Sequence, residues 1–344
     1  MDQLVSVNIV IYNGEKYIRQ CLDSVLRQNY PRDQIEVNIF DNNSTDATLE
    51  IIESNLANWK SIITNFRHIK YSSNIGMWPG QEELLKNSRG EYILALSVDV
   101  VLDRDFISKA LTVFNRDTTI GAVQGKVYKY VISSLKKTEG HNIIDTCGFE
   151  IFRSRRLSNI GHGEKDSGQY NSEGEIFGVE GAVPIFRKRA LEDCRVVGEI
   201  ADHKYFWYGD DFDIAWRMRL FGWKQVYTPE AVAYHDRLTT KTISKNYGDF
   251  MAIRQTVPMF KRRLDWRNTT LTIIKNDFAV NLMKDLHLII WRQFRLWIYF
   301  LFYEPVMFIE LFNIVKMLPN MLKKRRVILA RSKISPQKIH RWFK

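Results

Sequence analysis

Three aspartates that directly follow an aromatic run are the residues of this sequence best suited to chemistry. Asp210, Asp211 and Asp213 come after Tyr-Phe-Trp-Tyr-Gly at 205–209. Burial against aromatic surface raises the pKa of a carboxylate, which suits a general base that must accept a proton near neutral pH. Apolar residues then recur at helical spacing, so the acids are expected at a helix N-terminus, where the macrodipole stabilises negative charge. The alternative is a well-capped helix without a catalytic role, because acidic first turns are common.

A further acid and a histidine stand at the ends of other predicted strands. Asp99 follows the short apolar run 92–96, which is predicted to be a buried strand. A divalent metal prefers oxygen ligands and needs few of them from protein when phosphates supply the rest, so Asp99 is a candidate ligand. Asp also favours ordinary strand-end turns, which is the alternative. His235 follows the apolar run 231–234; a lone histidine is more often structural, but two acid clusters in the same region favour a role in the site.

The elements that must position these residues alternate between strand and helix. The patterns predict strands at 4–12, 35–40, 68–71 and 92–96, with helices at 15–28, 47–55 and 81–88. This alternation indicates βαβ units and a parallel sheet, in which ligands bind outside the carboxyl ends of the strands. Tyr12, Asn13 and Asp41 lie at such ends, as does the loop after Tyr71.

The following part of the chain continues the alternation with one long interruption. Helices are predicted at 106–114 and 187–194, and strands at 122–130, 176–186 and 222–227. Residues 136–175 are long for a structureless loop, which favours a lid or an acceptor-side insertion. Gly181 and Ala182 interrupt the strand predicted at 176–186, and this small pair would let a substrate approach the backbone closely.

Composition and charge exclude several classes of protein. The net charge is +11, yet residues 319–344 carry nine Lys and Arg and no acid, so the body is nearly neutral, unlike a typical nucleic-acid binder. The three cysteines are far apart and form neither a disulfide framework nor a zinc motif, which favours a reducing compartment. The first residues lack the pattern of a signal peptide. No Gly-x-Gly-x-x-Gly follows the first strand, which argues against a dehydrogenase.

The C-terminal third is apolar but interrupted by charge. Residues 286–303 contain Arg292 and Arg295, and their longest uncharged run has eight residues, whereas a membrane span needs about 20. Pro305 then breaks the helix. We therefore expect amphipathic helices that lie in the membrane interface over 246–322, followed by a basic tail over 323–344 that is attracted to anionic lipid. A helical hairpin packed on the rest of the protein is the alternative, and a true span is a lesser one.

Several short motifs, taken together in their order and spacing, resemble a known family. The N-terminal half contains Val-Ile-Tyr-Asn-Gly, Asp-Asn-Asn-Ser-Thr-Asp from Asp41, Asn-Ile-Gly from Asn74 and Ser-Val-Asp from Ser97. The second half contains Gly-His-Gly-Glu-Lys-Asp-Ser-Gly-Gln-Tyr from 161, Gly-Val-Glu-Gly-Ala from 178, Tyr-Gly-Asp-Asp-Phe-Asp-Ile-Ala-Trp-Arg from 208 and Tyr-Thr-Pro-Glu-Ala-Val-Ala-Tyr-His from 227. Over essentially its whole length the chain resembles inverting GT-A glycosyltransferases of family 2, and within them the bacterial rhamnosyltransferase-like branch.

The resemblance implies an α/β fold with a Rossmann-like, mostly parallel sheet flanked by helices. The catalytic domain would cover 1–245, with a nucleotide-sugar half at 1–105 and an acceptor half at 106–245. It also implies roles for individual residues. Asp211 would be the catalytic base, and Asp99 and His235 would bind Mg²⁺ or Mn²⁺. The nucleotide-sugar-binding residues would be Tyr12, Asn13, Asp41, Asn43, Asn74, Gly76, Val98 and Asp99. The acceptor-binding residues would be Gly181, Ala182, Trp207, Tyr208, Asp210 and Arg217.

The activity implied is transfer of a sugar, L-rhamnose or a similar hexose, to a polyprenyl-linked or nascent cell-surface glycan. The donor favoured by the resemblance is dTDP-rhamnose, with a UDP-sugar as the alternative, and the place is the cytoplasmic face of the plasma membrane. Two positions depart from the family pattern: Ser97 replaces the first acid of the usual Asp-x-Asp, and Asp210 stands where Glu is usual. These departures motivate a second hypothesis, a non-catalytic relative that binds a nucleotide sugar or scaffolds an assembly complex.

Overall fold

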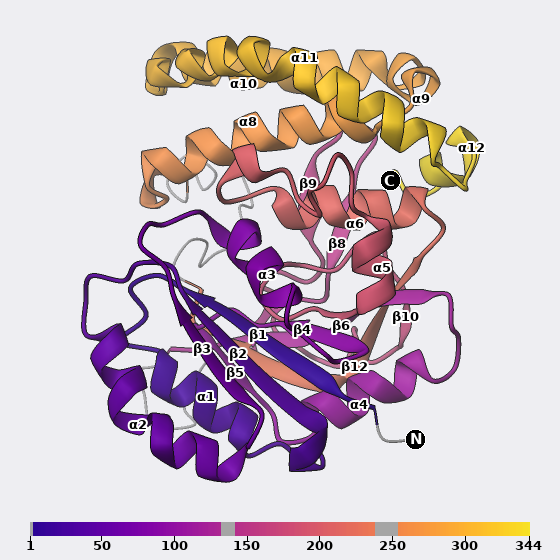
Figure 1. Ribbon diagram of the computed structural model, residues 1–344. Coiled ribbons are helices and arrows are strands. Elements are labelled where there is room, and N and C mark those ends of the chain that lie inside the picture. Colours follow the sequence, from indigo (N-terminus) through magenta and orange to yellow (C-terminus); the bar gives the residue numbers. More distant parts are fainter. Residues whose placement is uncertain (1–2, 132–141, 238–253) are drawn as a thin grey trace.

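A computed structural model describes residues 3–131, 142–237 and 254–344, and shows an α/β domain covered on one side by a layer of C-terminal helices (Figure 1). Its central sheet has ten strands, in the path β10-β12-β6-β11-β4-β1-β2-β3, with β5 and β7 paired to β12 and β6. These strands are β1 (Val5–Ile11), β2 (Ile35–Asp41), β3 (Phe66–Lys70), β4 (Tyr92–Ala95), β5 (Val100–Leu102), β6 (Ile120–Lys129), β7 (Ile144–Thr146), β10 (Gly174–Glu175), β11 (Ile185–Arg187) and β12 (Lys224–His235).

The sheet is parallel in its N-terminal half and mixed beyond it. β1 pairs in parallel with β2 and with β4, and β2 pairs in parallel with β3. β11 enters antiparallel between β4 and β6, because the chain returns through the short strands β7, β8 (Phe149–Ile151), β9 (Leu157–Asn159) and β10. Every residue of β1 and β2 is buried, as expected for strands covered on both faces. The predicted α/β fold is confirmed.

Helices flank this sheet and set the edge at which the predicted site residues collect. They are α1 (Ile18–Leu26), α2 (Thr48–Ile62), α3 (Met77–Leu85), α4 (Phe106–Phe114), α5 (Lys188–Asp193) and α6 (Asp210–Leu220). α3 begins four residues before the predicted helix, directly after Gly76, whose φ of 97° ends the preceding loop. The strand predicted at 222–227 extends to His235 as β12, so that His235 closes a long strand.

One stretch predicted as a strand is mostly irregular. Of residues 176–186, only 185 and 186 belong to a strand. The apolar side chains of Phe177 and Val179 are buried in the core nonetheless. A Cβ on Gly178 would lie 2.5 Å from the Ala215 Cβ, so this segment runs directly against α6. Burial against a helix therefore explains the apolar pattern that resembled a strand.

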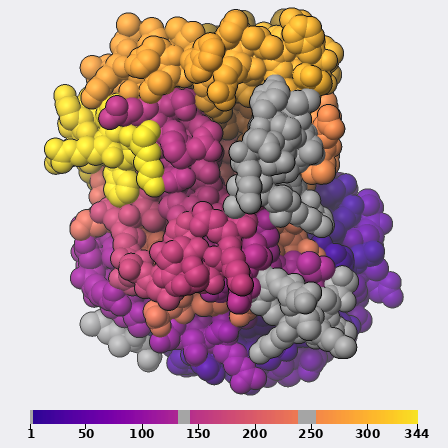
Figure 2. All heavy atoms as spheres, turned by 180° about the vertical axis from the view of Figure 1, so that it is seen from behind, coloured from indigo at the N-terminus to yellow at the C-terminus, as the bar shows by residue number. Residues whose placement is uncertain are grey.

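The C-terminal helices form two levels on the α/β domain (Figure 1). α8 (Met259–Asn276) packs on α6, and α11 (Ile309–Ala330) packs on α8. α9 (Ala279–Lys284), α10 (Leu286–Tyr303) and α12 (Pro336–His340) complete the layer, which Figure 2 shows from behind as the orange and yellow top of the molecule. The predicted boundary at 245/246 lies outside the described residues. In the described part, the helix Pro305–Ala330 is long and apolar enough to cross a bilayer by length and composition.

The basic tail expected at 323–344 does not form a separate segment. α11 continues through Pro319 to Ala330, and Lys324 is buried with its ammonium 2.8 Å from Asp202 Oδ2. Phe343 packs edge-on against Trp216 of α6. Part of the basic charge therefore neutralises buried acids of the α/β domain, and Phe343 packs into its core.

Candidate active site

The catalytic loop, residues 205–211, leads into α6 and presents Asp211 from the first turn. Tyr208 and Gly209 have positive φ angles of 66° and 76°, so the chain turns sharply before the helix. The Gly181 amide donates a hydrogen bond of 3.2 Å to Oδ2 of Asp211. A Cβ on Gly181 would lie 3.0 Å from this oxygen, so glycine permits the close approach of the two segments.

Asp211 lies in surroundings that favour its protonated form. Burial, followed by the negative charges of Asp210 and Glu180, raises its pKa well above that of an ordinary aspartate. Two amide hydrogen bonds oppose this shift: those from Gly181 and Phe212. Burial also raises the pKa of Asp210 to about 6. A desolvated carboxylate with raised pKa at the end of a tight loop is the arrangement that a general base requires.

A single buried side chain from the C-terminal layer shapes the catalytic loop. Asn268 of α8 is fully buried, and its Nδ2 donates to three loop carbonyls. These are the oxygens of Tyr205 at 3.1 Å, Trp207 at 2.9 Å and Tyr208 at 2.7 Å. Because the backbone around Tyr208 is in the left-handed region, these bonds stabilise a conformation that few non-glycine residues adopt. Asn268 thus helps to position the loop that carries Asp211.

The structure places Asp99 and His235, the two metal ligands implied by the resemblance, next to each other. His235 Nε2 lies 3.3 Å from Asp99 Oδ2, while its Nδ1 lies 2.9 Å from Asp145 Oδ2. The Ser97 hydroxyl donates a hydrogen bond of 2.7 Å to the other oxygen of Asp99, Oδ1, and so orients the carboxylate. Although burial opposes the shift, the charge of His235 and its hydrogen bond lower the pKa of Asp99 to about 2. Burial alone would lower the pKa of His235. The negative charges of Asp99 and Asp145 outweigh burial and raise this pKa to about 10.

The donor set of this pair fits a divalent cation in part. A carboxylate oxygen and an imidazole nitrogen converge, and the second imidazole nitrogen is held by a carboxylate, as is common for metal-binding histidines. Within the described ranges, no group of three or more His, Cys, Asp or Glu side chains is arranged to hold a metal. Two protein ligands suit a metal whose remaining positions are filled by phosphate and water.

The predicted nucleotide residues lie at the carboxyl ends of β1 and β2. Asp41 is fully buried; its Oδ1 accepts from the Ser44 amide at 3.1 Å, and its Oδ2 has no partner within the described residues. Asn13 and Asn43 adopt positive φ, and Tyr12 is half exposed. A buried carboxylate oxygen that lacks a donor is unusual in a folded protein and makes Asp41 a candidate acceptor for an N–H group.

The nucleotide side and the catalytic loop touch each other directly. The Met77 amide donates a hydrogen bond of 3.1 Å to the carbonyl oxygen of Phe206 in the catalytic loop. A Cβ on Gly76 would lie 2.6 Å from the same oxygen, which explains the glycine there. Asn74 Oδ1 accepts from the Gly76 amide at 3.0 Å and shapes this turn. The Val98 side chain, predicted to contact the nucleotide sugar, packs against Gly14 instead. A Cβ built on Gly14 would lie 3.2 Å from it.

The predicted acceptor residues divide into exposed and buried groups. Trp207 is 40% exposed, and its ring lies 4.8 Å from that of Tyr208. Ala182 is buried, and its carbonyl accepts from the Ser97 amide at 2.8 Å. Arg217 is buried; its guanidinium donates to the Cys194 and Ile200 carbonyls and, at 2.7 Å, to Asp213. Arg217 therefore supports α6 from inside and does not line the acceptor side.

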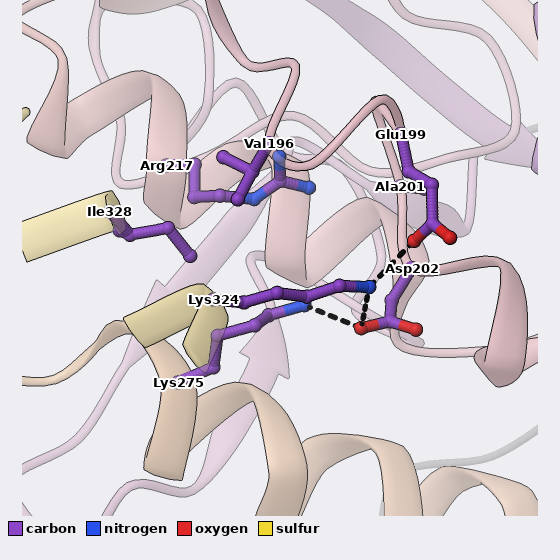
Figure 3. Close-up of a pocket in the computed structure, with 8 residues that line it drawn as sticks. All are labelled: Val196, Glu199, Ala201, Asp202, Arg217, Lys275, Lys324 and Ile328. Carbon is purple, nitrogen blue, oxygen red and sulfur yellow. Dashed lines mark hydrogen bonds and ion pairs between the residues drawn. The ribbon is translucent and has the colours of Figure 1, made fainter. Parts of the chain in front are cut away.

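A cluster of buried charges anchors α6 to the C-terminal layer (Figure 3). Asp213 Oδ2 lies 2.9 Å from Lys275, and Asp202 Oδ2 lies 3.3 Å from Lys275 and 2.8 Å from Lys324. Two helical positions turn a side chain by about 200°, so Asp213 points away from the side that carries Asp211. The small cavity in Figure 3, lined in part by Asp202, Arg217, Lys275 and Lys324, therefore belongs to this structural charge cluster.

Four functional side chains had not been singled out from sequence: Asn268, Asp145, Arg237 and Glu180. Arg237 lies 2.8 Å from Asp145 and 2.7 Å from Glu180, so it connects the metal-side histidine to the charges around Asp211. Glu180 lies inside the Gly-Val-Glu-Gly-Ala motif, which was a usable signal. Asp145, Arg237 and Asn268 stand in stretches without a motif and become recognisable through tertiary contacts.

Comparison with known proteins gives consistent results for sequence and fold. Residues 6–194 match the family described as Glycosyl transferase family 2. Poly-beta-1,6-N-acetyl-D-glucosamine synthase of Staphylococcus epidermidis is 24% identical over 282 residues, which cover 80% of this chain and 56% of that protein. The poly(ribitol-phosphate) beta-N-acetylglucosaminyltransferase TarS of Staphylococcus aureus is 32% identical over 107 residues, 30% of this chain and 18% of that protein.

Two solved structures share the fold. GalNAc-T7, solved with UDP, GalNAc and Mn²⁺, superposes with a TM-score of 0.58 at 13% identity over 79% of this chain and 48% of that chain. The mannosyltransferase PcManGT from Pyrobaculum calidifontis, solved with GDP-Man and Mn²⁺, has a TM-score of 0.52 at 17% identity over 99% of this chain and 83% of that chain. Both were solved with Mn²⁺, and both relatives' names refer to N-acetylglucosamine and to a polymer.

Proposed function

Since the chain belongs to glycosyl transferase family 2 and is a glycosyltransferase, we propose that it acts by inversion, with Asp211 as its base. It would transfer a sugar from a nucleoside-diphosphate donor to a lipid-linked or nascent cell-surface glycan. The observation that carries the proposal is the desolvated Asp211 carboxylate, which the Gly181 amide and the Asn268-bound loop hold in place. Burial and the neighbouring charges of Asp210 and Glu180 raise the proton affinity of this carboxylate, which suits it to accept a proton from an acceptor hydroxyl.

The proposed reaction is a single displacement. Asp211 takes the proton of an acceptor hydroxyl as that oxygen forms a bond to the anomeric carbon of the donor sugar. The bond from this carbon to the diphosphate oxygen breaks, and the nucleoside diphosphate leaves with the electron pair. Asp99 and His235 would hold Mg²⁺ or Mn²⁺, which would stabilise negative charge on the leaving group. Ser97, which replaces an acid, orients Asp99 through its 2.7 Å hydrogen bond.

The donor side supports a nucleotide with a base that donates an N–H group. The unpartnered Oδ2 of Asp41 could accept such a bond, and both uracil and thymine offer one. The rhamnosyltransferase-like motifs favour dTDP-rhamnose, whereas the N-acetylglucosaminyl polymers in the relatives' names favour UDP-N-acetylglucosamine. Tyr12, Asn13, Asn43, Asn74 and Gly76 would line this nucleotide-sugar site.

A donor screen tests the proposed activity. Membranes from a strain that overproduces the protein, supplied with a lipid-linked acceptor, are expected to release nucleoside diphosphate with one of dTDP-rhamnose, UDP-N-acetylglucosamine or GDP-mannose. Purified protein with the same donors and Mn²⁺ or Mg²⁺ serves as the soluble comparison. Lack of turnover with every donor, alongside retained nucleotide-sugar binding, would favour the non-catalytic, scaffolding alternative.

We propose further that the outer face of α9, α10 and α11 lies on an anionic membrane surface, as a peripheral attachment at the cytoplasmic leaflet. This outer face exposes large apolar side chains that include Met283, Ile290, Trp291, Phe294, Trp297, Leu301, Phe302, Phe312 and Val315. Apolar area of this extent marks an interaction surface. Tryptophan and tyrosine rings are typical of membrane–water interfaces. The opposite sides of α10 and α11, with Tyr299, Phe300 and Met321, pack inside the protein, which favours lying on the bilayer over crossing it.

The distribution of charge on these helices matches an anionic surface. Residues 279–344 contain three acidic side chains, and all three are buried: Asp285, Glu304 and Glu310. They are ion-paired inward, Asp285 with Arg155 at 2.6 Å, Glu304 with Arg254 at 2.9 Å and Glu310 with Arg263 at 2.6 Å. The exposed charges of the outer helices are therefore cations, namely Lys284, Arg295, Lys316, Lys323 and Arg326. Each contributes about 1 kcal/mol of attraction near anionic lipid.

Replacing Phe302 and Phe312 together by aspartate is expected to weaken vesicle binding at least about 10-fold, because burial of one aromatic side chain contributes about 1.5–3 kcal/mol. The two side chains are 73% and 72% exposed, so the fold loses little packing. Co-sedimentation with phosphatidylserine-containing vesicles measures the effect, and Val197→Asp, at an exposed apolar position of the catalytic domain, is the matched control. Undiminished binding of the double variant, or equal binding of the wild type to neutral vesicles, would contradict this surface.

A further inference from the structure

The first part of α8 and the residues before it carry several cations, and one of them differs from its neighbours. Arg254 and Arg262 are ion-paired with Glu304, and Arg263 and Arg267 with Glu310. Lys261 is half-buried, yet no carboxylate lies within ion-pair distance of it in the described ranges 3–131, 142–237 and 254–344. Partial burial of a cation without a counter-ion disfavours its charged form, so its position requires another explanation.

Lys261 stands over the catalytic loop. Its ammonium lies 4.4 Å from the ring centroid of Trp207 and 5.6 Å from that of Tyr208. Burial lowers the pKa of Lys261, and the charge of Asp99 acts in the opposite direction. The lysine thus stands over the aromatic rings that precede Asp211, and its ammonium feels the charge of Asp99. It comes from the first turn of α8, where the helix dipole also favours an anion.

We propose that Lys261 binds a phosphate group at the junction of the donor and acceptor sides, an inference that rests on the proposed function. The ammonium would contact a phosphate oxygen, and Trp207, 40% exposed, would present its ring to the adjoining sugar. A lysine is a common point-charge ligand for phosphate. The phosphate is either the diphosphate of the nucleotide sugar or the phosphate that links a lipid-borne acceptor to its polyprenol, because both chemistries meet at this junction.

The competing explanation is that contact with the two rings alone holds Lys261 in place. Such cation–π contacts contribute about 0.5–2 kcal/mol, enough to order a side chain. This explanation predicts a loss of stability in Lys261→Met with no change in phosphate binding. The phosphate-site explanation predicts weaker phosphate binding by Lys261→Met. A binding measurement therefore separates the two explanations.

Binding of two probes to Lys261→Met, Lys261→Arg and the wild type tests the inference. The first probe is inorganic pyrophosphate with Mn²⁺, and its binding is measured by calorimetry. The second is phosphatidylcholine vesicles with and without polyprenyl phosphate, and their binding is measured by co-sedimentation. Lys261→Met is expected to weaken one of them about 10-fold or more, as for loss of a charge-assisted hydrogen bond, while Lys261→Arg retains most of the affinity. Loss with pyrophosphate assigns the donor diphosphate, and loss with polyprenyl phosphate assigns the acceptor.

Lys60→Met, at an exposed position of α2, is the matched control and is expected to bind like the wild type. Wild-type affinity of Lys261→Met for both probes, or no binding of either probe by the wild type, overturns the inference. Neither measurement requires turnover. A protein that shows no sugar transfer but binds pyrophosphate through Lys261 would therefore refute the proposed function and leave this site standing.

Discussion

Replacing Asp211 by asparagine is expected to lower kcat by about 10²- to 10⁴-fold, the usual contribution of a general base. The asparagine has the same shape and keeps an oxygen for the Gly181 amide, so donor binding and the fold should be preserved. Release of nucleoside diphosphate under saturating donor and acceptor measures the effect. An Asp211→Asn enzyme as active as the wild type would refute the assignment of the base.

The pH dependence provides an independent check on the same residue. A base must be deprotonated, so activity falls as the pH drops through the pKa of Asp211. Burial and the charges of Asp210 and Glu180 raise this pKa, which places the acidic limb of kcat/KM above the ordinary aspartate range of about 3.9. Asp210→Asn removes one repelling charge and is expected to move this limb to lower pH. An unchanged midpoint in Asp210→Asn would contradict the coupling of the two acids.

Replacing Asp213 by asparagine is expected to reduce the free energy of unfolding by about 3–5 kcal/mol, the usual cost of removing one partner from a buried ion pair. Asp213 is fully buried and is the shared counter-ion of Arg217 at 2.7 Å and Lys275 at 2.9 Å. The substitution changes the charge and not the volume, so no cavity contributes. Denaturant unfolding at neutral pH, compared with the wild type, gives the difference.

The matched control for Asp213→Asn is Asp117→Asn, which breaks an ion pair with Lys224 at the surface. Exposed pairs contribute at most about 1 kcal/mol, so a small change is expected. The pKa of Asp213 is lowered, since Arg217 and Lys275 outweigh burial. Its contribution is therefore complete above the unfolded-state pKa and declines as the pH falls below about 4. Equal effects of the two substitutions would contradict the structural role of Asp213.

The strands and helices that follow from the local pattern of apolar residues were predictable from the sequence. The apolar runs that became β2 and β4 place Asp41 and Asp99 at strand ends, and the apolar stretch 286–303, one part of the predicted helical region 246–322, forms α10. Parallel strands bring their carboxyl ends to one edge, so the order of strands and helices along the chain is enough to assign Asp41 and Asp99 to one side of the sheet. The family resemblance named Asp99 and His235 as metal ligands; the structure places them 3.3 Å apart, and their role as ligands stays a prediction.

Features that depend on distant contacts were not predictable from local pattern. Asn268 and Lys261 lie in α8, whose sequence carries no motif, and they reach the site because α8 packs on α6. The family resemblance placed Arg217 among the acceptor residues, yet the helix directs it into the core. The charge of Lys324 suggested a tail, whereas Asp202 and Glu199 hold it within the domain.

The buried charge cluster of Asp202, Asp213, Lys275 and Lys324 joins parts of the chain that are synthesised at different times. Lys324 pairs with Asp202 across 122 positions of chain, and Asn268 holds the catalytic loop from 60 positions beyond Tyr208. During synthesis at the ribosome these later residues emerge after the sheet and α6. Until they arrive, Asp213 and Asp202 lack Lys275 and Lys324, and the catalytic loop lacks its three amide hydrogen bonds. We expect the nascent chain to build its nucleotide side first and to acquire a competent base only when the outer helices have docked.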